Sequence, residues 1–148
     1  MKMREVVIVD GMRTAFGRMG GALRPFTPVQ LAGMTIKGLV EKTKIMEKGN
    51  VDAVFAGSAS GDLNCHNFAR YATLLAGLPY ETSSTFIEMQ CGSSIACINN
   101  AALQIQAGLI DTAICGGAEA HSQDYWKFSA AVEPYKDIPP KAAPRRLA

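Results

Sequence analysis

Apolar residues recur along the chain in short runs that alternate with periodic stripes. The runs are rich in β-branched residues and are bounded by Gly, Pro or polar residues, which predicts strands at 4–11, 51–61, 83–90 and 111–117. Stripes at helical spacing predict helices at 28–44, at 67–76 and at 94–107. Alternating short apolar strands and helices are typical of an α/β fold, a sheet covered by helices on both faces.

The first helix has a sequence signal at its start. Thr27 is a good N-cap, Pro28 suits the first helical position, and Gln30 completes a capping box. Two of the strand runs also echo each other, because "DAVFAG" and "DTAICG" both place a Gly five residues after an Asp. The alternation of strand-like runs and helical stripes ends after Gly117, and the last residues are basic and rich in proline.

The helix at 94–107 carries apolar side chains around most of its circumference. Such a helix is buried on nearly all sides, but a single sheet covers only one face. The pattern therefore predicts a further covering layer, either a second half of the fold or another subunit.

Composition excludes several classes of protein. The chain has 148 residues, which suits one domain, and its net charge of +2 is too small to indicate nucleic acid or an anionic membrane as partner. Residues 89–110 carry no charge, but polar side chains interrupt them and argue against a membrane span. Four cysteines without a CxxC motif or a visible signal peptide predict free thiols in the cytoplasm and no metal site.

The stretch "EMQCGSS" places Cys91 between a predicted strand and a predicted helix. The first amides of a helix are unpaired and the helix dipole is positive there, and both effects favour a thiolate over a thiol. The amides of Gly92 and Ser93 could also donate hydrogen bonds to an oxyanion. Cys91 is therefore a candidate nucleophile, and the alternative is a small core thiol.

The remaining candidates have plainer interpretations. Cys97 and Cys115 lie inside a predicted helix and strand and are expected in the core, whereas Cys65 lies in a polar loop. His121 and Glu119 either take part in acid–base chemistry or line a turn. The segment "GMRTAFGRMGG" matches neither the GxGxxG nor the P-loop spacing and is expected to close on neighbouring segments.

Four collinear segments resemble the N-terminal half of the thiolases, a family that includes acetyl-CoA acetyltransferases and 3-ketoacyl-CoA thiolases. They read "VDGMRTAFGRMGGAL", "NFARYATLLAGLP", "MQCGSSIACINNAALQIQAG" and "AICGGAEAHS", and the resemblance covers residue 4 to about residue 122. It implies a mixed sheet covered by helices in one of two similar halves that pack face to face. It also implies an N-terminal domain at 1–118, with 119–148 beginning a loop region or forming a flexible Pro-rich tail.

The resemblance implies that Cys91 accepts an acyl group from a coenzyme A thioester and passes it to a second thiol or carbanion. Coenzyme A is then a substrate, and no separate cofactor is expected. The family's activating histidine ("GHP") and second cysteine ("CxGGG") lie in the C-terminal half, and residues 1–148 contain neither motif. We therefore expect a homo-oligomer, or a partner chain carrying that half, for turnover. The alternatives are a truncated or assembly subunit without catalysis and a condensing enzyme that depends on a carrier protein.

Overall fold

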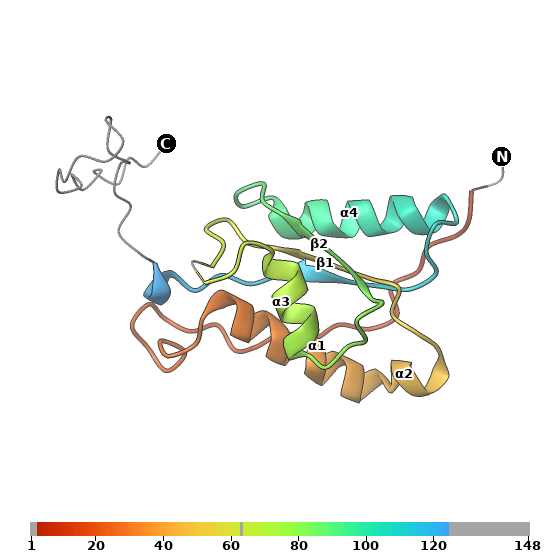
Figure 1. Cartoon of the computed structure of the whole chain (residues 1–148). Coiled ribbons are helices and arrows are strands. Elements are labelled where there is room, and N and C mark those ends of the chain that lie inside the picture. Colours follow the sequence, from red (N-terminus) through yellow and green to blue (C-terminus); the bar gives the residue numbers. More distant parts are fainter. Residues whose placement is uncertain (1–2, 63, 125–148) are drawn as a thin grey trace, which may run out of the picture.

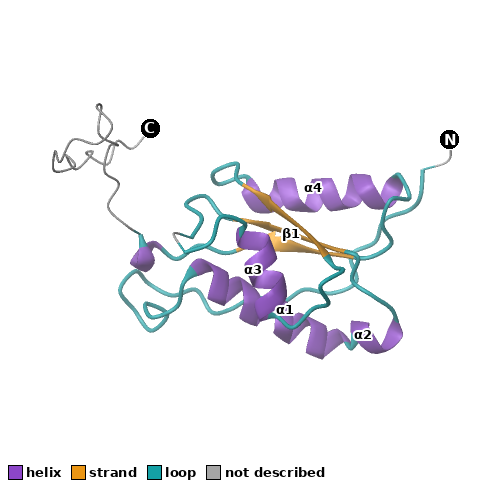
Figure 2. Cartoon of the chain, viewed as in Figure 1, coloured by secondary structure: helices purple, strands orange, loops and turns teal. Residues whose placement is uncertain are grey.

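The computed structural model describes residues 3–62 and 64–124 as a parallel sheet with helices on both faces (Figure 1). The strands β1 (Ala53–Gly57), β2 (Ser83–Ile87) and β3 (Ala113–Gly117) lie in the order β2-β1-β3. One face carries α4 (Ser93–Gln106), and the other carries α1 (Pro28–Thr43) and α3 (Phe68–Leu75) (Figure 2). Two short elements, α2 (Ile45–Lys48) and the 3-10 helix η1 (His121–Gln123), complete the order.

Strand β1 occupies the centre of the sheet because all of its residues can be buried. Each of its five residues is buried, and Phe55 is paired in register with Thr85 of β2 and Cys115 of β3. A parallel strand covered on both faces reads as a continuous apolar run, which this strand does. The predicted alternation of strands and helices is thus confirmed for these three strands.

The start of α1 follows the predicted capping box. The Thr27 hydroxyl accepts a hydrogen bond from the Gln30 amide at 3.3 Å, and the Gln30 side chain accepts one from the Thr27 amide at 2.9 Å. The helix then crosses α3 closely, because a Cβ atom on Gly33 would lie 2.9 Å from the Cβ of Leu75. It ends at Thr43, and the C-cap Lys44 has a φ of 53° that separates α1 from the short α2. The sequence pattern did not predict α2.

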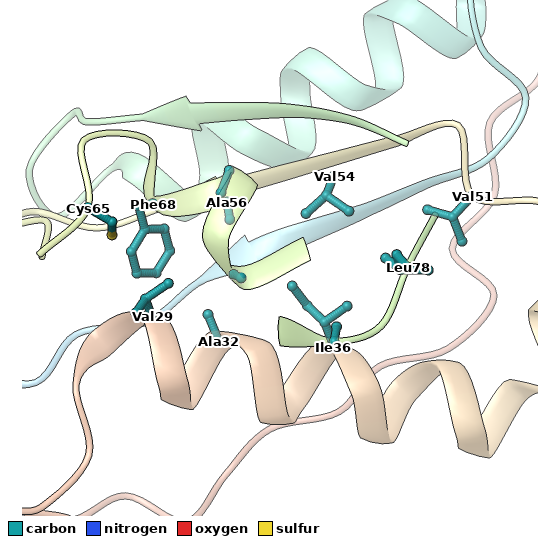
Figure 3. Close-up of a cluster of buried hydrophobic side chains, with 12 residues drawn as sticks. Val29, Ala32, Ile36, Val51, Val54, Ala56, Cys65, Phe68 and Leu78 are labelled. Carbon is teal, nitrogen blue, oxygen red and sulfur yellow. The ribbon is translucent and has the colours of Figure 1, made fainter. Parts of the chain in front are cut away.

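The main core lies between the sheet and the helices α1 and α3 (Figure 3). Phe68 is fully buried there, and its ring centroid lies 5.6 Å from that of Phe86. Cys65, expected in a polar loop, instead belongs to this core and is 7% exposed. The loop is polar, but it turns between Asp62 and Cys65 just before α3 begins, and the small thiol packs against the core.

The predicted strand at 4–11 is wrong for the described structure. This segment is extended but has no strand pairing, and Ile8 and Val9 are 87% and 85% exposed. Ion pairs from Arg4 to Asp111 and from Lys42 to Asp10 hold its two ends against the fold. A β-branched composition favours a strand but does not by itself create the pairing, and among the described residues this segment pairs with neither edge strand of the sheet.

Helix α4 is covered on one face only within the described part of the chain. Its buried residues are Ser93, Cys97 and Ala101, and the last two belong to a second, smaller core cluster between α4 and the sheet. Ile95 and Leu103 are 62% and 63% exposed. The predicted cover over this outer face stays a prediction. Across residues 3–62 and 64–124, no helix is both long and apolar enough to cross a bilayer.

Candidate functional site

Cys91 lies in the turn that joins the end of β2 to the start of α4, as the sequence predicts. Its side chain is exposed, and it lines an open cavity of about 580 Å³ at the carboxyl edge of the parallel sheet. In open α/β sheets this edge is where ligands usually bind. The other walls come from the segment 12–19, from α1 and from the segments that follow β1 and β3. The cavity is within the size range of small-molecule sites.

The turn before Cys91 is held by several hydrogen bonds. Gln90 has a φ of 49°, in the left-handed region that a residue with a side chain seldom adopts. The Ser93 hydroxyl, on a residue that is 3% exposed, accepts from the Met89 amide at 2.9 Å and donates to the Gln90 carbonyl at 2.7 Å. These bonds stabilise a backbone conformation that would otherwise be costly.

The amides of Gly92 and Ser93 take part in the same turn. The Gly92 amide donates to the Met89 carbonyl at 3.0 Å, and the Ser93 amide donates to the Gln90 carbonyl at 3.1 Å. Both donors therefore have protein acceptors in this structure. Their predicted role as support for an oxyanion and for the helix start stays a prediction, and the geometry favours support of the turn.

Two glycines let the first turn of α4 rest directly on the sheet. A Cβ atom on Gly57 would lie 2.7 Å from the Cβ of Ser93, and one on Gly117 would clash with the Ser94 hydroxyl. Sequence reasoning missed this pair. The echo between the two Asp-to-Gly runs points to Gly57 and to Gly116, whereas the register pairs Gly57 with Gly117.

Burial separates Cys91 from the other three thiols. Desolvation, with a smaller contribution from the neighbouring Cys115, raises the pKa of Cys97 to about 11. Burial also raises the pKa of Cys115, and burial together with the charge of Asp62 raises the pKa of Cys65. The core position of Cys97 is confirmed, since it is 0% exposed, and Cys115 is half-buried against the same cluster. Among the described cysteines, Cys91 alone is exposed.

Glu119 and His121 line the same cavity as Cys91. The Glu119 carboxylate accepts hydrogen bonds from the Ser58 hydroxyl and the Ala59 amide. His121 Nδ1 lies 3.1 Å from a carboxylate oxygen of Asp124. Glu119 is thus held by the segment that follows β1, whereas His121 is held within its own 3-10 turn. A role of either side chain in acid–base chemistry stays a prediction.

The Gly-rich segment before α1 closes on the chain after β3, as predicted. The Gly20 amide donates to the Ser122 hydroxyl at 2.9 Å, and the Gln123 side chain donates to the Arg24 carbonyl. These contacts hold the segment before α1 at the rim of the cavity. The predicted loop or tail at 119–148 falls mostly on residues 125–148, outside the described residues.

Comparisons with known proteins agree with the resemblance. The family described as "Thiolase, N-terminal domain" matches residues 6–140. A 3-oxoadipyl-CoA/3-oxo-5,6-dehydrosuberyl-CoA thiolase of Escherichia coli is 42% identical over 123 residues, which is 82% of this chain and 30% of that protein. A steroid 3-ketoacyl-CoA thiolase of Mycobacterium tuberculosis is 38% identical over the same length and the same shares.

The fold is also found in a solved structure. The crystal structure of the Bacillus anthracis acetyl-CoA acetyltransferase matches with a TM-score of 0.79 and 32% identity, over 87% of this chain and 33% of that one. The chain thus spans about a third of the length of the proteins it matches. The predicted α/β fold class is confirmed, but the sheet of the described residues is parallel and not mixed, because β1 pairs in parallel with both β2 and β3.

Proposed function

The chain belongs to the thiolase family through its N-terminal domain, and from this we propose that it carries the cysteine nucleophile of an acyl transfer between coenzyme A thioesters. The observation that carries the proposal is the position of Cys91. It is the exposed thiol at the carboxyl edge of the sheet, beside the start of α4, in a cavity of substrate size. The four free thiols fit the reducing cytoplasm.

In the proposed reaction, the Cys91 thiolate attacks the carbonyl carbon of an acyl-CoA thioester. The bond between that carbon and the coenzyme A sulfur then breaks, and the coenzyme A thiolate leaves and takes up a proton. The acyl group remains on Cys91 as a thioester until a second thiol or carbanion accepts it and returns the thiolate. Gly92 and Ser93 support this step by holding the start of α4 in place.

We propose that turnover needs groups from outside residues 1–148. The two histidines of the chain are His66 and His121, and the resemblance assigns neither to catalysis. General acid–base help is worth about 10²–10⁴-fold and an oxyanion donor about 10²–10³-fold. The uncovered face of α4 is where a C-terminal half, in the same assembly or in another copy, would pack.

The test is acylation of the 148-residue chain by acetyl-CoA or acetoacetyl-CoA, followed by peptide mapping. We expect a single acyl group on Cys91, no multiple turnovers, and loss of the label in Cys91→Ser. Cys115→Ser is the matched control, because it removes a half-buried thiol and should leave the label in place. Labelling that survives Cys91→Ser would refute the assignment.

The same assay separates the alternatives. Acylation by a carrier-protein thioester but not by acetyl-CoA would indicate the condensing enzyme. No acylation, combined with stable binding to a C-terminal half, would indicate an assembly subunit. Multiple turnovers at an ordinary enzyme rate, abolished by Cys91→Ala, would show that residues 1–148 contain the remaining catalytic groups.

A further inference from the structure

One carboxylate joins the two segments that follow β1 and β3. Glu119 lies two residues after β3, and its oxygens lie 3.1 and 3.2 Å from the Ser58 hydroxyl, which donates to them. The Ala59 amide donates to the same carboxylate at 2.6 Å. Ser58 is 3% exposed and also accepts a hydrogen bond from the Gly61 amide at 3.0 Å. We call Glu119, Ser58 and Ala59 the strand-end clamp.

The strand ends that the clamp joins are the surface on which α4 begins. The Ala118 amide donates to the Gly57 carbonyl at 3.1 Å, and Gly57 is the register partner of Gly117. The space between Gly57 and Ser93 does not admit even one additional carbon atom. If these two strand ends separated, the first turn of α4 would lose its support and the turn that presents Cys91 would shift with it.

We propose that Glu119 is a positioning residue for the Cys91 nucleophile, acting through the strand-end clamp rather than by contact with the reacting atoms. The inference rests on the acyl-transfer function proposed above. Hydrogen bonds to an ionised carboxylate are about twice as strong as those between neutral groups. Glu119 therefore links the segments that follow β1 and β3 through hydrogen bonds in addition to packing.

Two reactions of Cys91 separate its positioning from its exposure to solvent. Glu119→Ala removes the acceptor for Ser58 and Ala59, and acyl transfer from acetyl-CoA to Cys91 should fall by about tenfold or more because this step depends on orientation. Alkylation of Cys91 by iodoacetamide needs an accessible thiolate but no oriented substrate, so its rate should stay within about twofold. Glu119→Gln keeps an acceptor oxygen for the Ala59 amide and should recover most of the transfer.

Two controls accompany this comparison, both on the 148-residue chain. Glu47→Ala removes an exposed glutamate in α2 and should leave both rates unchanged. Alkylation of Cys97, which is 0% exposed, reports opening of the fold and should stay slow in every variant.

Ser58→Ala should lower acyl transfer, as Glu119→Ala does. The double variant should lose less than the product of the two single losses, because the two residues share one interaction.

Three outcomes would overturn the proposal. The first is acyl transfer at the wild-type rate in Glu119→Ala, and the second is a loss of transfer that accompanies faster alkylation of Cys97. The third concerns the clamp alone and can be tested even if the wild-type chain accepts no acyl group. That failure would refute the proposed function but not the clamp. In that case Glu119→Ala should still speed hydrogen exchange of the Ala59 amide and shift the amide resonances of Gly92 and Ser93. Unchanged exchange and resonances would refute the clamp itself.

Discussion

Replacing Gly57 by alanine should displace the start of α4 from the sheet. The new Cβ atom would lie 2.7 Å from the Cβ of Ser93, 3.0 Å from its carbonyl carbon and 3.1 Å from the Ile87 carbonyl oxygen. Two of these three neighbours are backbone atoms, which cannot rotate away. Gly57 does not have a positive φ, so the cost is one of space and not of backbone conformation.

The size of the effect follows from these distances. Carbon atoms pack best at about 3.5–4.0 Å, so the gap between β1 and α4 would have to widen by roughly 0.8 Å or more. Adding a methyl group to a filled interior typically costs about 1–3 kcal/mol of unfolding free energy, and we expect the upper part of that range here. That loss is a large fraction of the roughly 5–15 kcal/mol by which domains are usually stable.

The assay is urea unfolding of the 148-residue chain, followed by far-ultraviolet circular dichroism. Gly116→Ala is the matched control, because it changes the neighbouring strand and a Cβ there would meet nothing within 4 Å. It should alter stability by no more than about 0.5 kcal/mol. Equal stability of Gly57→Ala and Gly116→Ala would refute the reasoning.

Three further predictions concern reactivity, pH and assembly. At pH 8, iodoacetamide should label Cys91 first, because burial raises the pKa of Cys97 to about 11 and leaves roughly one thousandth of it ionised; peptide mapping that finds equal rates would contradict this. The amides of Thr112 and Asp111 hold the pKa of Asp52 below its usual value, so its stabilising contribution is present above about pH 4 and is lost as the pH falls further. Asp52→Asn should therefore flatten the acid side of the curve of unfolding free energy against pH. The uncovered face of α4 should drive association, because exposing a large aliphatic side chain forfeits roughly 1.5–3 kcal/mol; a compact monomer at micromolar concentration in sedimentation, without binding of an apolar dye, would count against it.

Features that depend on neighbours in the sequence were predictable from the residues. Thr27 and Gln30 are three positions apart, so their reciprocal hydrogen bonds form wherever the helix forms, and the start of α1 is as predicted. The same holds for the place of Cys91 between β2 and α4, since the apolar run before it and the helical stripe after it are both local patterns. The family resemblance added the expected role of Cys91, which no local pattern could decide against a core thiol.

Features that depend on distant partners needed the tertiary structure. Residues 4–11 have the composition of a strand, yet in the described structure they pair with neither edge strand, and composition cannot say where a segment will lie. Glu119 meets Ser58 and Ala59 across some 60 positions, and nothing near Glu119 in the sequence indicates those partners. Local hydrogen bonds are determined by spacing along the chain, whereas pairing, close packing and long-range hydrogen bonds exist only once the sheet brings separate segments to the same edge.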